Sequence, residues 1–253
     1  MVGCIACEFK LKPSEAVVSE SGLHVQRYDR LESRYLTTGD FSALQQMNTE
    51  YPMETRTLIE DVLKLGLVYE PNINSRFLAF YQDSLLQVVI SDVEAEFANM
   101  DDLNEKFQAS FSQLSREFPN LKLPMIYAQI GAFTQSIVVG NGTIGISLDK
   151  YLGPEYPPYA RFYDVEQRKT MTREYIVPDA LVFYLLSQYP LRNFDSRTQE
   201  QKDLHVGKVM WIVNEVTGEK SFDTPFVKRV DAFVKKHPIS MQKLLGSVYL
   251  KGL

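Results

Sequence analysis

The stretch QSIVVGNGTIGISL, residues 135–148, predicts the centre of the fold. Asn141-Gly142 is the residue pair that most strongly indicates a two-residue hairpin turn, and apolar residues flank it on both sides. After the turn, apolar and small residues alternate in the order Ile144, Gly145, Ile146, Ser147, Leu148. Because successive side chains of a strand point to opposite faces, we expect one buried apolar face and one face of small residues.

Helical patterns lie on both sides of this hairpin. They predict helices over residues 40–47, 53–65, 102–118, 172–188 and 198–216, one or two short helices over 75–98, one that begins at Thr224 and a short last one after Pro238. A predicted strand over residues 123–130 precedes the hairpin. The expected fold class is therefore α+β, with helices that flank a small mixed sheet with a β-hairpin, and with a helical C-terminal part. We expect an N-terminal anchor or tether with an irregular lead-in over residues 1–36, followed by a single domain over residues 37–253.

Residue types at helix ends and on helix faces give more detailed expectations. Asp40 can cap the first helix, and Asp102 with Glu105 has the sequence pattern of a capping box. Helical spacing places one set of residues toward the core: Phe41, Leu44 and Met47 in the first helix, and Ile176, Ala180, Phe183 and Leu186 in the helix at 172–188.

The composition excludes several classes of protein. Of the 253 residues, 45% are hydrophobic and 12% are aromatic, which is enough for a packed core and too much for a disordered chain. The net charge of −5 argues against a nucleic-acid partner, because phosphate contacts need a basic surface. No segment reaches the roughly 18 apolar residues of a membrane-spanning helix.

The only two cysteines, Cys4 and Cys7, lie within the first seven residues. A C-x-x-C pair could be redox-active or half of a metal site, although no further ligands are near in sequence. The two residues could also be inert. A third interpretation is lipidation of Cys4, because the small residue Gly3 precedes it, as bacterial lipoprotein processing favours, and a polar stretch follows at 10–20. Three residues before Cys4 are too few for a signal peptide, so this interpretation needs a longer precursor.

The search for catalytic and metal-binding residues finds little. His24 is expected at the surface and His237 at the basic end of a helix, while His205 could face a groove but has no second histidine or cysteine near it. The chain has neither a G-x-S-x-G motif nor a phosphate-binding loop. Asp149 ends the hairpin just before a loop, where it could cap the next turn or belong to a site. No metal or cofactor is expected.

The loop after the hairpin is rich in tyrosine and proline. Its residues of these types are Tyr151, Tyr156, Tyr159, Tyr163, Pro154, Pro157 and Pro158. Rigid amphipathic side chains of this kind are common at binding interfaces, and they are also common in cores. Both interpretations remain open at this point.

Several segments together resemble a known family. They are Phe118-Pro119 after a Phe-rich helix, the hairpin strand 142–149, Tyr151-Leu152-Gly153, residues 174–179 at the start of the next helix, and residues 205–211. Over about residues 74–216 the chain resembles the GldB-like gliding-motility lipoproteins of Bacteroidetes, which are similar to predicted zinc proteases with an H-E-x-x-H helix. Residues 224–253 do not match that family.

The resemblance implies a lipid-anchored, periplasm-facing protein of the cell envelope with a zincin-like fold. If the helix at 172–188 matches the zincin active-site helix, Pro178, Asp179 and Val182 occupy the positions of the two histidines and the glutamate. Proline and valine cannot bind zinc, so the resemblance implies a pseudoenzyme without a metal site.

The expected function is therefore that of a non-catalytic scaffold or assembly factor with unknown envelope partners. The alternative is a zincin-like protein that binds a ligand, or keeps residual hydrolytic activity, in a cleft between the hairpin and the helix at 172–188. Besides Cys4 as the lipidation site, the residues of a candidate interaction surface are Asp149, Tyr151, Tyr156, Tyr159, Tyr163, Asp179 and His205.

Overall fold

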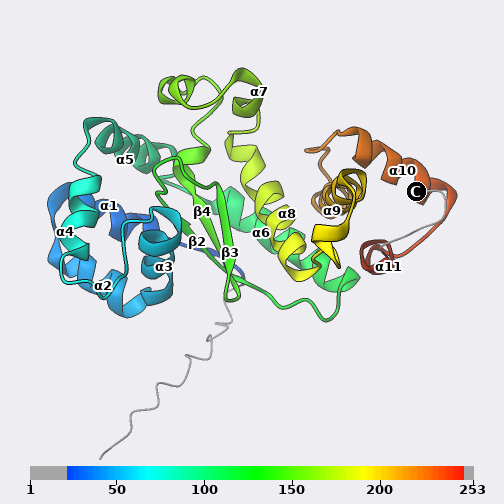
Figure 1. Ribbon diagram of the computed structural model, residues 1–253, viewed down its shortest axis with the longest axis horizontal. Helices are drawn as coiled ribbons and strands as arrows, with labels where there is room; N and C mark the ends of the chain where they lie inside the picture. The colour runs from blue at the N-terminus through cyan, green and yellow to red at the C-terminus, as the bar shows by residue number, and fades with distance from the viewer. Residues whose placement is uncertain (1–21, 248–253) are drawn as a thin grey trace, which may run out of the picture.

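The computed structural model describes residues 22–247, in which a four-stranded sheet lies between two groups of helices (Figure 1). The strands are β1 (Val25–Gln26), β2 (Met125–Gln129), β3 (Ile137–Gly140) and β4 (Thr143–Ser147). Their order in the sheet is β1-β2-β4-β3; β2 is parallel to β1 and β4, and β3 is antiparallel to β4. The predicted hairpin, and the strand before it, are confirmed.

The helices of the described residues account for the rest of the α+β fold. They are α1 (Tyr28–Thr38), α2 (Phe41–Glu50), α3 (Pro52–Arg56), α4 (Ile73–Phe80), α5 (Ser84–Glu96), α6 (Asp101–Glu117), α7 (Val165–Arg168), α8 (Ile176–Gln188), α9 (Gln199–Thr217), α10 (Pro225–Lys236) and α11 (Met241–Gly246). A wider π-helical segment, Thr57–Val62, continues α3. The helices α1 to α5 lie on one side of the sheet, and α6, α8 and the C-terminal helices lie on the other (Figure 1).

The expected irregular lead-in is wrong from Val25 onward. β1 pairs with β2, and α1 packs against the sheet, where the ring of Tyr28 meets that of Tyr127 edge-on at 6.1 Å. The helix was missed because two of its buried residues, Asp29 and Glu32, are charged and interrupt the apolar pattern of its inner face.

Both faces of the central strands β2 and β4 are buried along most of their length, and the small residues of β4 have a packing role. Gly145 lies beside Tyr127 of β2 in the parallel register. A Cβ atom on Gly145 would lie 2.5 Å from the Tyr127 hydroxyl oxygen, so only glycine leaves room for this ring. Ile144 and Ile146 point to the opposite face, on the side from which α8 contacts β3 and β4.

Some details of the helices differ from expectation. Asp40 caps α2 as predicted, with its side chain accepting a hydrogen bond from the Ser42 amide. Asp102, however, lies in the first turn of α6 and forms an ion pair with Arg173 at 2.7 Å instead of a capping box.

Two aromatic side chains that were expected in the core are exposed. The side chain of Phe41 is 79% exposed, and that of Phe183 is 45% exposed. Phe183 could not be placed by periodicity, because α8 carries apolar residues on nearly all sides and eight of its residues are buried.

Candidate functional site

Asp149, at the end of β4, is fully buried and holds the chain where it leaves β2. Its Oδ1 accepts a hydrogen bond from the Gly131 amide at 2.6 Å, and its Oδ2 accepts one from the Phe133 amide at 2.5 Å. Ala132 and Phe133 have φ angles of 48° and 63°, in the left-handed region that residues other than glycine rarely occupy. The carboxyl group of Asp149 therefore stabilises an unfavourable backbone turn. Burial raises the pKa of Asp149, against the opposing effect of the two backbone donors.

A second buried carboxyl group, that of Glu32 in α1, binds the preceding amide. Glu32 Oε2 accepts a hydrogen bond from the Ile130 amide at 2.8 Å, and the Tyr81 hydroxyl lies beside the same carboxyl group. Burial raises the pKa of Glu32 well above its usual value, and the nearby Asp149 and Asp29 raise it further. Glu32 is not among the residues expected from the sequence to form a site; its spacing of four residues from Tyr28 was the available signal.

Two tyrosines of the loop after β4 fasten that loop to the same turn. The Tyr159 hydroxyl donates to the Asp149 carbonyl oxygen at 2.6 Å and accepts a hydrogen bond from the Leu152 amide at 3.0 Å. The Tyr163 hydroxyl donates to the Phe133 carbonyl oxygen at 2.5 Å. Tyr159 is completely buried, and Tyr163 is partly buried.

The other two tyrosines connect the loop to helices. The Tyr151 hydroxyl donates to Asp179 Oδ2 in α8 at 2.9 Å, and the Tyr156 hydroxyl donates to Asp92 Oδ2 in α5 at 2.7 Å. Burial raises the pKa of Asp179 to about 6, although the hydrogen bond from Tyr151 opposes this. Tyr151 is buried, so of the candidate surface tyrosines only Tyr156 and Tyr163 keep a partial exposure.

The structure therefore brings six of the seven candidate surface residues into one region and leaves His205 apart. Asp179 lies in the first turn of α8, whereas His205 contacts Tyr189, the residue that follows the last turn of that helix. The polar groups around Asp149 bind backbone atoms and one another, an arrangement that positions the loop. Among the described residues, no group of three or more His, Cys, Asp or Glu side chains could hold a metal ion.

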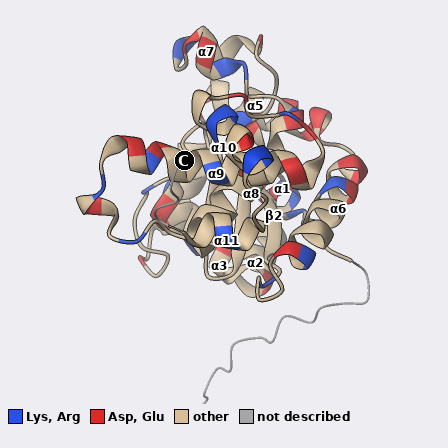
Figure 2. Ribbon diagram, turned by 90° about the vertical axis from the view of Figure 1, so that its right-hand side faces the viewer, with Lys and Arg blue, Asp and Glu red and all other residues tan. Residues whose placement is uncertain are grey.

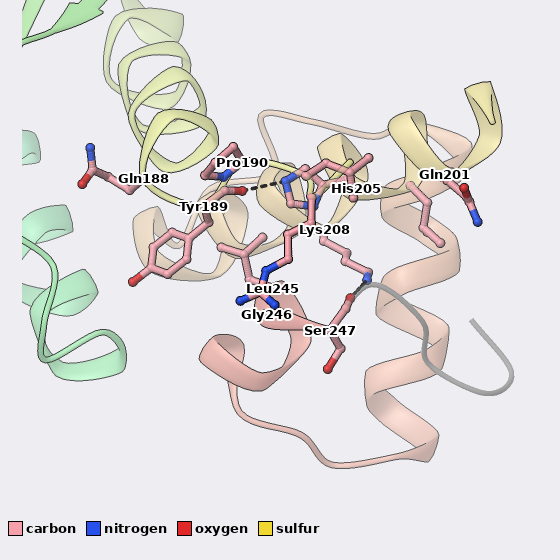
Figure 3. Close-up of a pocket in the computed structure, with 12 residues that line it drawn as sticks. Gln188, Tyr189, Pro190, Gln201, His205, Lys208, Leu245, Gly246 and Ser247 are labelled. Carbon is pink, nitrogen blue, oxygen red and sulfur yellow. Dashed lines mark hydrogen bonds between the residues drawn. The ribbon is translucent and has the colours of Figure 1, made fainter. Parts of the chain in front are cut away.

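His205 lines a cavity of about 240 Å³ that is formed by the chain after α8, the first half of α9 and the end of α11 (Figure 3). His205 Nε2 lies 2.8 Å from the Tyr189 carbonyl oxygen. A carbonyl oxygen can only accept, so we assign the proton to Nε2 and leave Nδ1 as an acceptor. Burial and the positive charge of Lys208 lower the pKa of His205, which keeps the ring neutral at neutral pH.

Replacement of Glu32 by Gln should stabilise the protein at neutral pH and flatten the pH dependence of its stability. A carboxyl group whose pKa is raised in the folded state contributes stability below its unfolded pKa of about 4.3, and this contribution is lost as the pH rises through the folded value. Gln still offers an acceptor to the Ile130 amide and never ionises. Thermal midpoints measured from about pH 4 to about pH 8 should diverge in favour of Glu32→Gln as the pH rises.

The matched control is Glu105→Gln, which removes an exposed carboxyl group from α6. Its midpoints should follow those of the wild type at every pH. A midpoint difference between Glu32→Gln and the wild type that stays constant with pH would mean that the carboxyl group of Glu32 has the same pKa in the folded and unfolded states, contrary to this account.

Comparisons with known proteins are consistent with the expectations from the sequence. None of the described helices has the length and apolar character needed to cross a membrane. Neither the curated proteins nor the solved structures include a match to the chain. A family model with the description "Gliding motility protein GldB" matches residues 11–225, a range that ends at the first residue of α10. The resemblance noted in the sequence is thereby confirmed, and the chain belongs to the GldB family of gliding motility lipoproteins.

Proposed function

We propose that this protein is a non-catalytic, lipid-anchored component of the cell envelope that faces the periplasm and acts as a scaffold or assembly factor. Membership of the GldB family is the observation that carries the proposal. The site geometry supports it, because Asp149 and the tyrosines beside it serve the fold: their polar groups bind the backbone and neighbouring side chains.

The anchor in this proposal is Cys4, which lies outside the described residues. The residues before and after Cys4 support it, since Gly3 precedes the cysteine and a polar stretch follows. A lipid on Cys4 would hold the folded domain at the membrane without a spanning helix.

The partner in this proposal is another protein of the envelope. Phe162 and Val165, on the arm that carries α7, are 56% and 62% exposed and lie close to the partly exposed Tyr163. Exposed apolar side chains next to tyrosine support a protein contact there. On the side that carries α9 to α11, basic and acidic residues are interspersed, which supports a protein partner over a nucleic acid (Figure 2).

We further propose that α8 and the hairpin form a zincin-like framework without its metal ligands. The contacts of α8 with β3 and β4 support this relation. Pro178 and Val182 are buried, and Asp179 accepts the hydrogen bond from Tyr151. These three residues therefore have packing roles where an active zincin would carry its metal-binding and catalytic side chains.

Lipidation of Cys4 predicts that cells expressing the full-length precursor incorporate labelled palmitate into this protein. Cys4→Ser should abolish the label and release the protein from the membrane fraction, because the thiol that carries the lipid is gone. Cys7→Ser is the matched control and should keep both label and location. Label that persists in Cys4→Ser but disappears in Cys7→Ser would show that Cys7 is the lipidated residue. The absence of label in the wild type would refute the lipid anchor.

The pseudoenzyme proposal predicts that the protein, purified without a histidine tag, contains far less than one equivalent of zinc. The reason is that no register of α8 supplies two histidines to one metal ion. Elemental analysis of the purified chain tests this directly. A stoichiometric, tightly held metal would favour the alternative, in which the cleft between the hairpin and α8 binds a ligand or hydrolyses a substrate.

A further inference from the structure

The cavity beside His205 is lined by basic residues and by no acidic one. Arg192 and Lys208 are the arginine and lysine residues of its wall, and burial lowers the pKa of the Lys208 ammonium group. None of the lining residues is Asp or Glu. The wall of the cavity therefore has a positive character, although the chain as a whole has more acidic than basic residues.

The ammonium group of Lys208 is buried without a counter-charge. Lys208 is only 3% exposed, and its Nζ donates a hydrogen bond to the Ser247 carbonyl oxygen at 2.8 Å. That oxygen satisfies one of the three N–H donors, and no carboxylate of the described residues forms an ion pair with Lys208. Because a buried charge is costly unless an opposite charge pairs with it, an anion bound here would be stabilised.

The remaining wall suits a small ligand with an apolar part. Leu204 and Leu245 line the cavity, and the neutral ring of His205 adds no further charge. Its volume of about 240 Å³ lies below the roughly 300–1,000 Å³ of sites for drug-sized molecules. The ligand is therefore expected to be small.

We propose that this cavity binds the carboxylate or phosphate group of a small organic anion. Lys208 provides the buried positive charge, and Arg192 provides an exposed one. The oxyanion accepts hydrogen bonds from the Lys208 N–H groups that do not bind the Ser247 carbonyl oxygen, and Leu204 and Leu245 contact the apolar part of the ligand. This inference goes beyond the scaffold role and does not depend on it.

Calorimetric titration of the purified chain with three probes of one length tests the proposal. The probes are hexanoate, hexyl phosphate and the uncharged 1-hexanol. At least one of the two anions should bind with a dissociation constant below about 1 mM, and 1-hexanol should bind much more weakly. The anion that binds more tightly shows whether the site prefers a carboxylate or a phosphate group. Failure of both anions to bind, or equal binding of 1-hexanol, would overturn the proposal.

Three substitutions locate the binding. Lys208→Met should weaken it by roughly 30-fold or more, as expected when one member of a buried charge pair is removed. Arg192→Gln, at an exposed position, should weaken it by roughly two- to fivefold. Lys202→Met is the matched control, since Lys202 lies on the same helix but stacks on the Phe194 ring at 4.3 Å and does not line the cavity.

The control should leave the affinity unchanged. Equal losses of affinity in Lys208→Met and Lys202→Met would show that the overall charge of the protein determines binding, and would overturn the proposal. If Lys208→Met does not fold, as judged by its thermal transition, Arg192→Gln decides the question: a lower affinity supports the site, and an unchanged affinity refutes it.

Discussion

The amides of Ile130, Gly131 and Phe133, as the chain leaves β2, impose the constraint on which the centre of this structure depends. These N–H groups lie away from water, where each unpaired donor would cost about 1–3 kcal/mol. Two buried carboxyl groups bind them: Glu32 comes from α1, and Asp149 comes from the end of β4. The contact joins the N-terminal helices to the hairpin, and it is the reason why acidic residues are tolerated inside a core of aromatic and aliphatic side chains.

This arrangement also decides where a ligand could bind. The carboxyl ends of parallel strands often face a crevice that holds a ligand, and here β2 and β4 end side by side. Asp149, the turn after β2 and the loop with Tyr159 fill that position. The cavity with Lys208 lies elsewhere, beyond the C-terminal end of α8. The chain belongs to a family of gliding motility lipoproteins, and the polar groups at the centre of its fold bind backbone atoms and one another.

Local patterns were enough to predict much of the fold. The hairpin at Asn141-Gly142, the cap at Asp40 and the α+β class follow from short-range preferences of the backbone, and the structure confirms them. The helix α1 and the exposure of Phe183 were not predictable in this way. In α1, two buried carboxyl groups interrupt the apolar pattern, and the amide that Glu32 binds is distant in sequence. The helix α8 is apolar on nearly every side. The family resemblance was visible in the sequence. A groove beside His205 was expected as well, but its cationic wall was not, because α9 and α11 meet only through tertiary packing.

The central claim is that Glu32 and Asp149 lock the chain after β2. Native-state hydrogen exchange of the Ile130, Gly131 and Phe133 amides tests it most directly, because all three residues lie outside the strands. If the buried carboxyl groups bind these amides, they should exchange as slowly as the amides of β2 and β4, through global unfolding. Exchange as fast as that of the exposed turn at Asn141-Gly142 would show that the turn opens on its own and would contradict the account.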